Sequence, residues 1–300
     1  GEHICRSVAK EKIMKKTLQT GYKTRKVFSA VAFALGIAIL LVFIIFAIFG
    51  EKIAPYKPNE SFDSFLSCSK EHLLGTNNIG FDIWSQLIVA TRPTLVVGVT
   101  SALACVVIGV VIGVIAGYAG KVAGEAVNGF INFFLLIPML PMAIVIAAYT
   151  KGNSASIILT ISMLCWCSTA RTVRAKTMSV KNSDFVRSLK TLGYSPRRIL
   201  FRHVLPNVLD VAAAKFIPSV ASCIMVEATL SFLGMGSFDS VTWGVMINYA
   251  YTYGGVSLEK YNWLFAPGIA IMLIQISFYM IQQYIEFRRV VVQNATINRD

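Results

Sequence analysis

The side chains in this sequence that could do chemistry are few and widely separated. Its three histidines, His3, His72 and His203, are too far apart in the chain to form a recognisable pair. No Gly-x-x-x-x-Gly-Lys-Ser/Thr phosphate loop, Gly-x-Ser-x-Gly elbow or His-Glu-x-x-His pair occurs. The sequence therefore provides no phosphate loop for ATP and no hydrolase or metalloprotease centre.

The six cysteines do not follow a metal-binding pattern either. Cys165 and Cys167 are two residues apart, which places them on different faces of a helix. No second pair of Cys or His lies near them in the sequence, and Cys105 and Cys223 lie in other apolar runs. We therefore expect no metal site, and Cys68, in a polar stretch, has no evident disulfide partner.

The composition indicates a membrane protein. Of the 300 residues, 55% are hydrophobic and 14% are charged, whereas soluble domains carry about 25% charged residues. The net charge of +13 would suit a nucleic-acid-binding protein, but the positions of the charges indicate otherwise, as described below. The excess of apolar side chains needs a lipid bilayer as solvent.

Six apolar runs approach or exceed the ~20 residues that a helix needs to cross a ~30 Å hydrocarbon core. They comprise residues 27–50, 93–120, 126–150, 152–170, 216–236 and 261–285. The first run lacks a small-residue cleavage site, so we interpret it as a retained anchor and not as a signal peptide. The sequence therefore predicts an all-α, polytopic transmembrane helical bundle.

Lys and Arg residues predict the orientation of this bundle. They concentrate in a basic N-terminal segment (1–26), in the 171–210 loop and in the tail (286–300). With six spans, all three lie on one side, and such an excess marks the cytoplasmic side. Both termini are therefore predicted to be cytoplasmic, residues 51–92 form an outer loop, and residues 93–285 form the core. On this interpretation, the positive charge orients the protein in the membrane and attracts lipid headgroups, and it does not indicate nucleic-acid binding.

Polar residues and helix breakers inside the spans are candidates for a translocation pathway. Glu227 is the only acid in the middle of a span, and it either lines the pathway or bonds to an outer loop. Asn128 and Asn132 share one helix face, and we favour bonding to a neighbouring helix over pathway lining. Bends are expected at Pro138, Pro141 and Pro218, and Gly109, Gly113 and Gly117 predict a close helix contact.

The 171–210 loop carries the signals of two short helices. Ser183 is a good N-cap, Asp184 suits a helix N-terminus, and Gly193 provides a stop. Ser195-Pro196 begins the second helix, with Ser as cap and Pro at the first helical position. Leu205-Pro206 is expected to end it and lead back to the membrane.

The first of these short helices is expected to present an apolar face. Phe185, Leu189 and Leu192 can lie along one side of it. Exposed apolar side chains on a short capped helix fit the groove of a partner protein better than they fit water. We therefore interpret this loop as a docking element and not as a solvated basic loop.

The same loop resembles the EAA loop of ABC importer permeases. That motif is the triplet EAA, three residues, Gly, nine residues and a stretch ending in Leu-Pro. Gly193 and Leu205-Pro206 have this spacing, but the triplet itself reads Arg187-Ser188-Leu189. On this resemblance, the loop would couple the spans to an ATPase through Ser183, Asp184, Phe185, Arg187, Leu189, Leu192, Gly193, Ser195, Pro196, His203, Leu205 and Pro206.

Further segments resemble the dipeptide/oligopeptide/nickel permease family, in particular the second, C-type, permease of each pair. They are Pro-Tyr-Lys-Pro-Asn at 55–59, His-Leu-Leu-Gly-Thr at 72–76, Glu-Ala-Thr-Leu-Ser-Phe-Leu-Gly-Met-Gly at 227–236, Thr-Trp-Gly at 242–244 and Trp-Leu-Phe-Ala-Pro-Gly at 263–268. Asn77 and Phe81 stand where the family pattern has an acid and an Arg, and the sequence after Phe278 departs from it.

This resemblance implies a permease subunit that is not an enzyme and binds no cofactor. Its partners would be a second homologous permease, two cytoplasmic ATPases that bind ATP and Mg, an extracytoplasmic substrate-binding protein and membrane lipid in a prokaryotic cytoplasmic membrane. The substrate would be short peptides, or alternatively nickel or a metal chelate, moved by alternating access. A stand-alone channel or ion-coupled transporter is the alternative from another class. It would show paired charges or inverted repeats in the spans, and neither is found.

Overall fold

The computed structural model describes the backbone of residues 2–149, 152–237 and 239–297. Within these residues the chain consists of helices, loops and two isolated β-bridges, which confirms the all-α prediction. The helices are α1 (Glu2–Ile53), α2 (Ile83–Tyr118), α3 (Lys121–Leu136), α4 (Met139–Tyr149), α5 (Ser154–Lys181), α6 (Asp184–Thr191), α7 (Pro196–Ile199), η1 (Leu200–Val204), α8 (Leu205–Leu230), η2 (Ser231–Met235), α9 (Trp243–Thr252) and α10 (Tyr261–Ile297). The two η elements are π-helical turns.

Among the described residues, five helical segments are long and apolar enough to cross a membrane, and a bent pair makes a sixth if it is counted as one span. The pair is α3 and α4, whose axes differ by 85° at the break. Ile137 at the break has the extended backbone that a following proline imposes. The bend expected at Pro138 is therefore confirmed. Pro141 and Pro218 lie inside α4 and α8, so no break in either helix occurs there.

Several helices extend beyond their apolar runs, into residues that were assigned from the sequence to the outer loop and to the 171–210 loop. The Asp82 carboxylate accepts a 2.8 Å hydrogen bond from the Ser85 backbone N–H and so begins α2 ten residues before Pro93. Helix α5 continues to Lys181 and is roughly 42 Å long at ~1.5 Å per residue. The charged side chains that end an apolar run are good helix formers, so they do not end the helix.

The chain divides into two compact units, residues 1–41 with 276–300, and residues 42–275. In the first unit, the Ser277 hydroxyl donates a 2.7 Å hydrogen bond to the Gly36 carbonyl. The rings of Phe33 and Tyr284 stack with their centroids 4.3 Å apart. These contacts join α1 and α10 within this unit.

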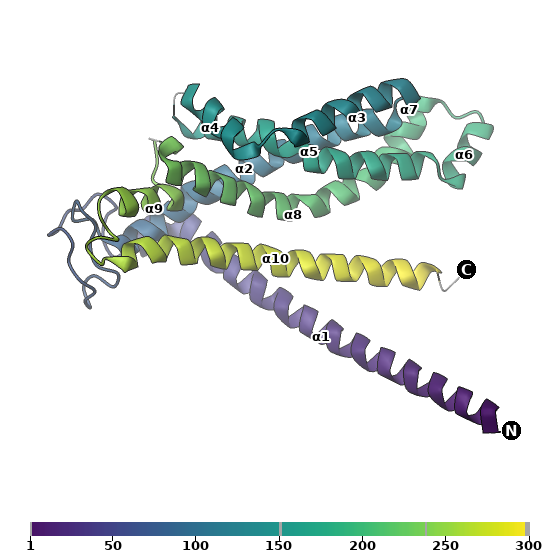
Figure 1. The fold of residues 1–300 in the computed structure, drawn as a ribbon, viewed down its shortest axis with the longest axis horizontal. Helices are drawn as coiled ribbons and strands as arrows, with labels where there is room; N and C mark the ends of the chain where they lie inside the picture. Colours follow the sequence, from purple (N-terminus) through teal and green to yellow (C-terminus); the bar gives the residue numbers. More distant parts are fainter. Residues whose placement is uncertain (1, 150–151, 238, 298–300) are drawn as a thin grey trace. The chain divides into compact units, whose positions relative to one another are not determined.

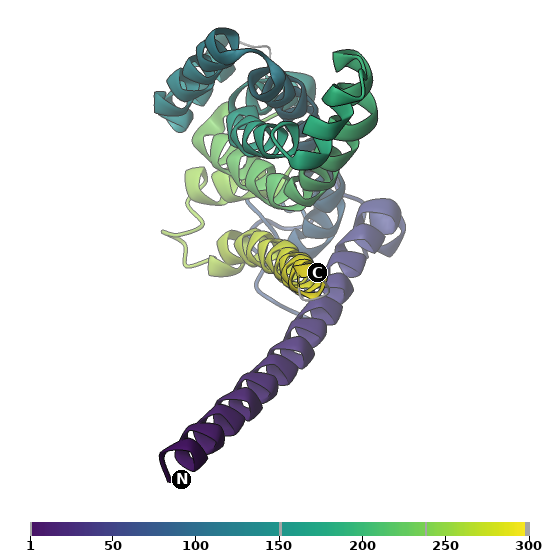
Figure 2. The ribbon, with the colours of Figure 1, turned by 90° about the vertical axis from the view of Figure 1, so that its right-hand side faces the viewer.

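Helices α2, α5 and α8 pack side by side and form the centre of the second unit (Figures 1 and 2). A Cβ atom at Gly113 would lie 2.6 Å from the Ala170 carbonyl oxygen, and one at Gly109 would lie 2.7 Å from the Thr169 Cβ. Only glycine allows the backbones to approach this closely. The close contact predicted from Gly109, Gly113 and Gly117 is thus confirmed as the α2–α5 seam.

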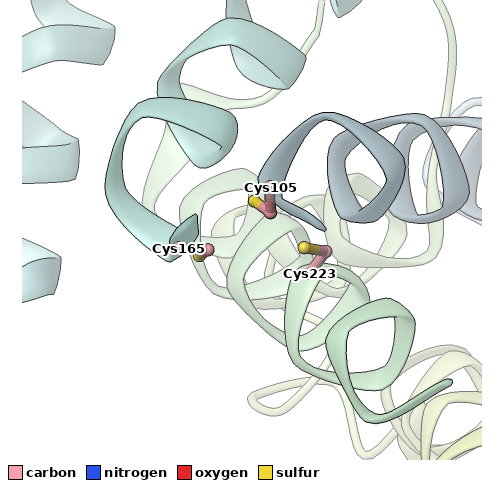
Figure 3. A group of neighbouring side chains, drawn as sticks. All are labelled: Cys105, Cys165 and Cys223. Atoms are coloured by element: carbon pink, nitrogen blue, oxygen red, sulfur yellow. The ribbon is translucent and has the colours of Figure 1, made fainter. Parts of the chain in front are cut away.

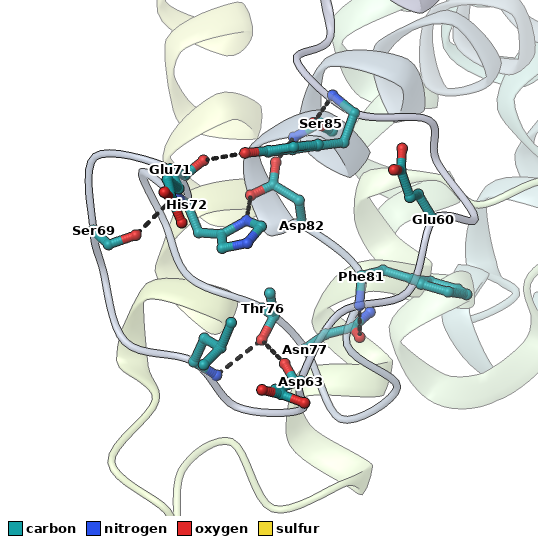
Figure 4. Close-up of polar contacts among 12 residues, drawn as sticks. Glu60, Asp63, Ser69, Glu71, His72, Thr76, Asn77, Phe81, Asp82 and Ser85 are labelled. Carbon is teal, nitrogen blue, oxygen red and sulfur yellow. Dashed lines mark hydrogen bonds and ion pairs between the residues drawn. The ribbon is translucent and has the colours of Figure 1, made fainter.

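The loop between α1 and α2 folds around a buried His72–Asp82 pair (Figure 4). The His72 Nδ1 atom lies 3.0 Å from the Asp82 carboxylate, and the ring of Phe62 packs edge-on against the imidazole. Because Asp82 also caps α2, this one carboxylate joins the loop to the helix. The loop is therefore a folded cap on α2.

Candidate functional site

The segment from Asn182 to Val204 begins with the capped helix that the sequence predicts. The Ser183 hydroxyl accepts a hydrogen bond from the Val186 N–H at the start of α6. At the other end, Gly193 has φ = +80°, and the Tyr194 N–H donates to the Leu189 carbonyl in a 6→1 bond. This is a Schellman motif. Ser183 as cap and Gly193 as left-handed stop are both confirmed.

The second short helix begins as expected but does not end at Leu205-Pro206. Ser195 caps α7, and Pro196 occupies its first turn. The π-helical turn η1 follows, in which the Leu205 N–H reaches the Leu200 carbonyl five residues back. This wider turn leads directly into α8, where Pro206 lies in the first turn and its missing N–H costs little. The helical backbone therefore continues from Pro196 to Leu233, and Gly234, with φ = +81°, interrupts it.

Leu189 was expected on the exposed face of α6, but the side of the helix that carries Leu189 is buried. Val186 and Leu189 pack into a core cluster with Val173 of α5 and Val208 of α8. Phe185 and Leu192 point outward and are 58% and 73% exposed. The prediction that Leu189 lies on the same free face as Phe185 and Leu192 is wrong, because Leu189 is one of the residues that fasten α6 to its own spans.

Tyr118 and Lys181, at the C-terminal ends of α2 and α5, hold the segment in place further. The Tyr118 hydroxyl donates a 2.7 Å hydrogen bond to the Pro196 carbonyl. The Lys181 ammonium donates to the Tyr118 and Ala119 carbonyls at 2.7 and 3.0 Å, which stabilises the C-terminal end of α2. No sequence motif indicated Tyr118, since its partner lies 78 residues away.

The outward side of the segment combines apolar and basic side chains. The large apolar members are Phe185, Leu192 and Phe201. Five exposed basic residues belong to the same segment, namely Arg187, Lys190, Arg197, Arg198 and Arg202. We call these eight residues the basic docking face. Exposed apolar side chains together with charged ones are typical of a protein interface.

His203 lies behind this face. Its ring packs edge-on against Phe185 at 5.4 Å between centroids, and its Nε2 atom is buried without a hydrogen-bond partner. Within the described structure, His203 therefore supports an exposed member of the docking face and does not contribute to that face itself.

The Glu-Ala-Thr-Leu-Ser-Phe-Leu-Gly-Met-Gly segment forms a hydrogen-bonded break between α8 and α9. The fully buried Glu227 carboxylate accepts hydrogen bonds from the hydroxyls of Ser231 and Thr242 at 2.6 and 2.7 Å. Gly234 has φ = +81°, and a Cβ atom on Gly244 would lie 2.7 Å from the Ala228 Cα. The Thr242 bond is the bond to a connecting loop that was considered for Glu227, and lining of a pathway by Glu227 stays a prediction.

The two asparagines proposed for the pathway lie on α3. Asn132 accepts a 3.4 Å hydrogen bond from the Arg171 guanidinium of α5, which supports the favoured role in helix bonding. Asn128 is half-buried four residues earlier. Lining of a pathway by Asn128 stays a prediction.

The structure also brings together three cysteines that are distant in sequence. The sulfur atoms of Cys105, Cys165 and Cys223 all lie within 4.8 Å of one another (Figure 3). The spacing argument against a metal site considered only neighbours in the sequence, so it could not detect this group.

Comparison with known proteins gives consistent matches. The family described as "Binding-protein-dependent transport system inner membrane component" matches residues 109–291. The "Oligopeptide transport system permease protein OppC" of Bacillus subtilis (strain 168) is 30% identical over 264 residues, which cover 86% of this chain and 85% of that protein. A protein of Brucella suis biovar 1 (strain 1330), named as a peptide permease, is 29% identical over 239 residues, 78% of this chain and 79% of that protein.

A solved structure shares the fold. A chain from the inward-facing conformations of the MetNI methionine ABC transporter superposes with a TM-score of 0.50 at 19% identity. The match covers 66% of this chain and 95% of that chain.

Proposed function

The chain belongs to the family of binding-protein-dependent transport system inner membrane components, and we propose that it forms half of the pore of an ATP-driven importer of short peptides. The peptide substrate is inferred from the names of its relatives in Bacillus subtilis and Brucella suis. The pore would alternate between inward-open and outward-open states, driven by ATPases on separate subunits.

The basic docking face is the observation that supports coupling to those ATPases. Phe185 and Leu192 are exposed on a helix whose other side is buried, so α6 presents two apolar anchors from a fixed base. The exposed Arg and Lys side chains of this face favour a partner whose groove has an acidic rim. A solvated loop would need neither the Schellman motif nor the buried side.

A movement of this face would be transmitted to the membrane spans. Val186 and Leu189 pass it to α5 and α8 through their shared core, and Tyr118 passes it to α2. The helical backbone is continuous from Pro196 to Leu233, so a displacement of α7 would also reach the Glu227 break at the far end. We propose that this lever opens and closes the pathway.

The remaining parts follow from the same proposal. A second permease would complete the pore, two ATPases would dock on the cytoplasmic side, and an extracytoplasmic binding protein would deliver the peptide. The chain would lie in the cytoplasmic membrane of a prokaryote, with both termini and the basic docking face inside. The folded cap around His72 and Asp82 would then face the binding protein.

The experiment replaces an exposed anchor with a charge. Leu192→Asp removes an apolar side chain from the proposed interface, and losing such an anchor costs about 2 kcal/mol or more, roughly thirtyfold in affinity. The variant would be expressed with its partners, followed by measurement of membrane insertion, ATPase capture and peptide uptake. We expect normal insertion with loss of capture and uptake.

Leu73→Asp is the matched control. Leu73 is also an exposed leucine (56%), but it lies on the folded cap, so its replacement should leave ATPase capture unchanged. Normal capture and uptake by Leu192→Asp would contradict the coupling role. A stand-alone channel would give that result, because a channel needs no docked motor.

A further inference from the structure

The three sulfur atoms of Cys105, Cys165 and Cys223 meet inside the second unit, one each from α2, α5 and α8 (Figure 3). Cys105 and Cys223 are buried, and Cys165 is half-buried. The Cys105 thiol also lies 3.7 Å from the Ile161 carbonyl oxygen, one helical turn before Cys165. Cys165 is eleven residues along α5, about 16 Å from its start, and so lies well inside a helix that is long enough to cross a ~30 Å hydrocarbon core.

The helices that carry these sulfurs are held in close contact. Gly109, one turn after Cys105, allows α2 to touch α5 at Thr169. On the other side, a Cβ atom on Gly98 would lie 2.3 Å from the Ile224 side chain, so α2 also touches α8 beside Cys223. Close packing therefore fixes the mutual position of the three backbones that carry the sulfurs. A preformed set of ligands binds with less loss of conformational entropy than a flexible one.

The chemistry of the ligands selects a soft cation. Thiolate sulfur prefers Cu(I), Zn(II) and iron–sulfur clusters, whereas hard cations such as Mg(II) prefer oxygen. With a metal–sulfur distance of about 2.3 Å, a flat three-sulfur site needs sulfurs about 4.0 Å apart. The three sulfur atoms lie within 4.8 Å of one another, so a small inward movement of the sulfurs would bring them to this separation.

Ligand number narrows the choice of ion further. Structural zinc takes four ligands, and among the described residues this group offers three. Cu(I) is the soft ion that fits a single three-sulfur site. Each cysteine binds it as a thiolate and releases its proton to water. Binding changes no oxidation state.

We propose that Cys105, Cys165 and Cys223 form a three-sulfur binding site for a soft monovalent cation, Cu(I). The ion joins α2, α5 and α8 at one point. Bound there, it opposes any rearrangement that separates these three helices. The site depends only on the packing of this chain, so its test does not require transport.

The test uses Ag(I), which binds as Cu(I) does and is not oxidised under these conditions. The full chain, with Cys5, Cys68 and Cys167 replaced by Ala, is placed in lipid nanodiscs and exposed to Ag(I) in the presence of excess glutathione. We expect one Ag(I) per chain after desalting, measured by elemental analysis. Cu(I) loaded in the same way should show three sulfur neighbours in X-ray absorption.

Each cluster cysteine is then replaced in turn. Loss of a hydrogen-bond partner outside the ligand set lowers metal affinity by roughly 10–100-fold. Loss of a ligand should lower Ag(I) affinity by more than this in each of the variants Cys105→Ala, Cys165→Ala and Cys223→Ala. A chain with Cys167 restored is the matched control and should still bind one Ag(I), because Cys167 is outside the group.

A structural readout separates loss of the site from loss of the fold. Ag(I) should raise the melting temperature of the three-cysteine chain and leave that of each Ala variant unchanged, with all variants eluting as single species. The proposal is overturned if the three-cysteine chain releases all Ag(I) to glutathione. It is equally overturned if a folded Ala variant retains the ion with unchanged affinity, or if X-ray absorption shows fewer than three sulfurs.

Discussion

The hydroxyl of Tyr118, the last residue of α2, donates a 2.7 Å hydrogen bond to the carbonyl oxygen of Pro196, the first residue of α7. The same tyrosine's backbone carbonyl accepts from Lys181, the last residue of α5. The ends of two spans and the docking segment thus meet at one residue, Tyr118.

This meeting point gives a first prediction. Tyr118→Phe removes only the hydroxyl, and a hydrogen bond of this kind contributes about 1 kcal/mol. We expect normal membrane insertion and normal ATPase capture. Peptide uptake should fall several-fold, because movement of the docking face is transmitted to α2 less efficiently. Uptake per inserted chain is the measurement. Tyr149→Phe, at a highly exposed tyrosine, serves as the control, and equal uptake by the two variants would exclude a transmitting role for Tyr118.

Gly193 gives a second prediction. Its φ of +80° disfavours any side chain with a β carbon, and a Cβ atom there would meet no other atom within 4 Å. Gly193→Val should therefore disturb α6 through backbone strain alone, by about 1–2 kcal/mol or more. Uptake should fall while the amount of chain in the membrane stays constant.

Gly120 provides a matched control for that strain. A Cβ atom at Gly120 would also meet open space, but its φ of −63° is one that valine can adopt. Gly120→Val should therefore transport normally. If both variants lose uptake equally, left-handed strain is not the cause.

The opposite orientations of two leucines give a third prediction. Leu189→Ala leaves a cavity in the core shared by α5, α6 and α8, and such changes cost about 2–5 kcal/mol. Leu192→Ala removes an exposed side chain and should leave the melting temperature nearly unchanged. Thermal unfolding in detergent distinguishes the two. A larger loss of stability in Leu192→Ala would show that the orientation of α6 is wrong.

Glu227 and Ser231 give a fourth prediction. The Ser231 hydroxyl donates to the buried Glu227 carboxylate at 2.6 Å. Removing either partner leaves the other poorly satisfied, so Glu227→Ala and Ser231→Ala should be strongly non-additive, by about 0.5–3 kcal/mol in a double-mutant cycle. Glu227→Ala combined with Thr100→Ala, an exposed hydroxyl on α2, should be additive. Additive losses in the Glu227–Ser231 cycle would mean that this hydrogen bond does not hold the break together.

Orientation in the membrane gives a fifth prediction. Residues 60 and 190 are both exposed, on the folded cap and on the basic docking face respectively. In a chain without Cys68, an impermeant maleimide added outside should label Glu60→Cys and spare Lys190→Cys. The reverse pattern would invert the proposed topology.

The sequence by itself determined those features that depend on a few neighbouring residues. Apolar runs of sufficient length predicted the spans, because a helix must cover a fixed thickness of hydrocarbon. Ser183, Ser195 and Gly193 predicted the starts and the stop of short helices, because capping bonds close within one turn. Pro138 predicted the bend in the third span for the same local reason.

Tertiary structure decided everything that depends on contacts between distant segments. Helix α6 has apolar side chains on several sides, so only its packing on α5 and α8 could determine that Leu189 is buried and Leu192 is free. Leu205-Pro206 was expected to end a helix, but the π-helical turn before Pro206 leads directly into α8, so the span continues. The three cysteines meet because the glycine seams set how α2 lies against α5 and α8. The spacing of these cysteines along the chain does not predict their cluster, because the register between helices is determined by packing between side chains that are distant in the sequence.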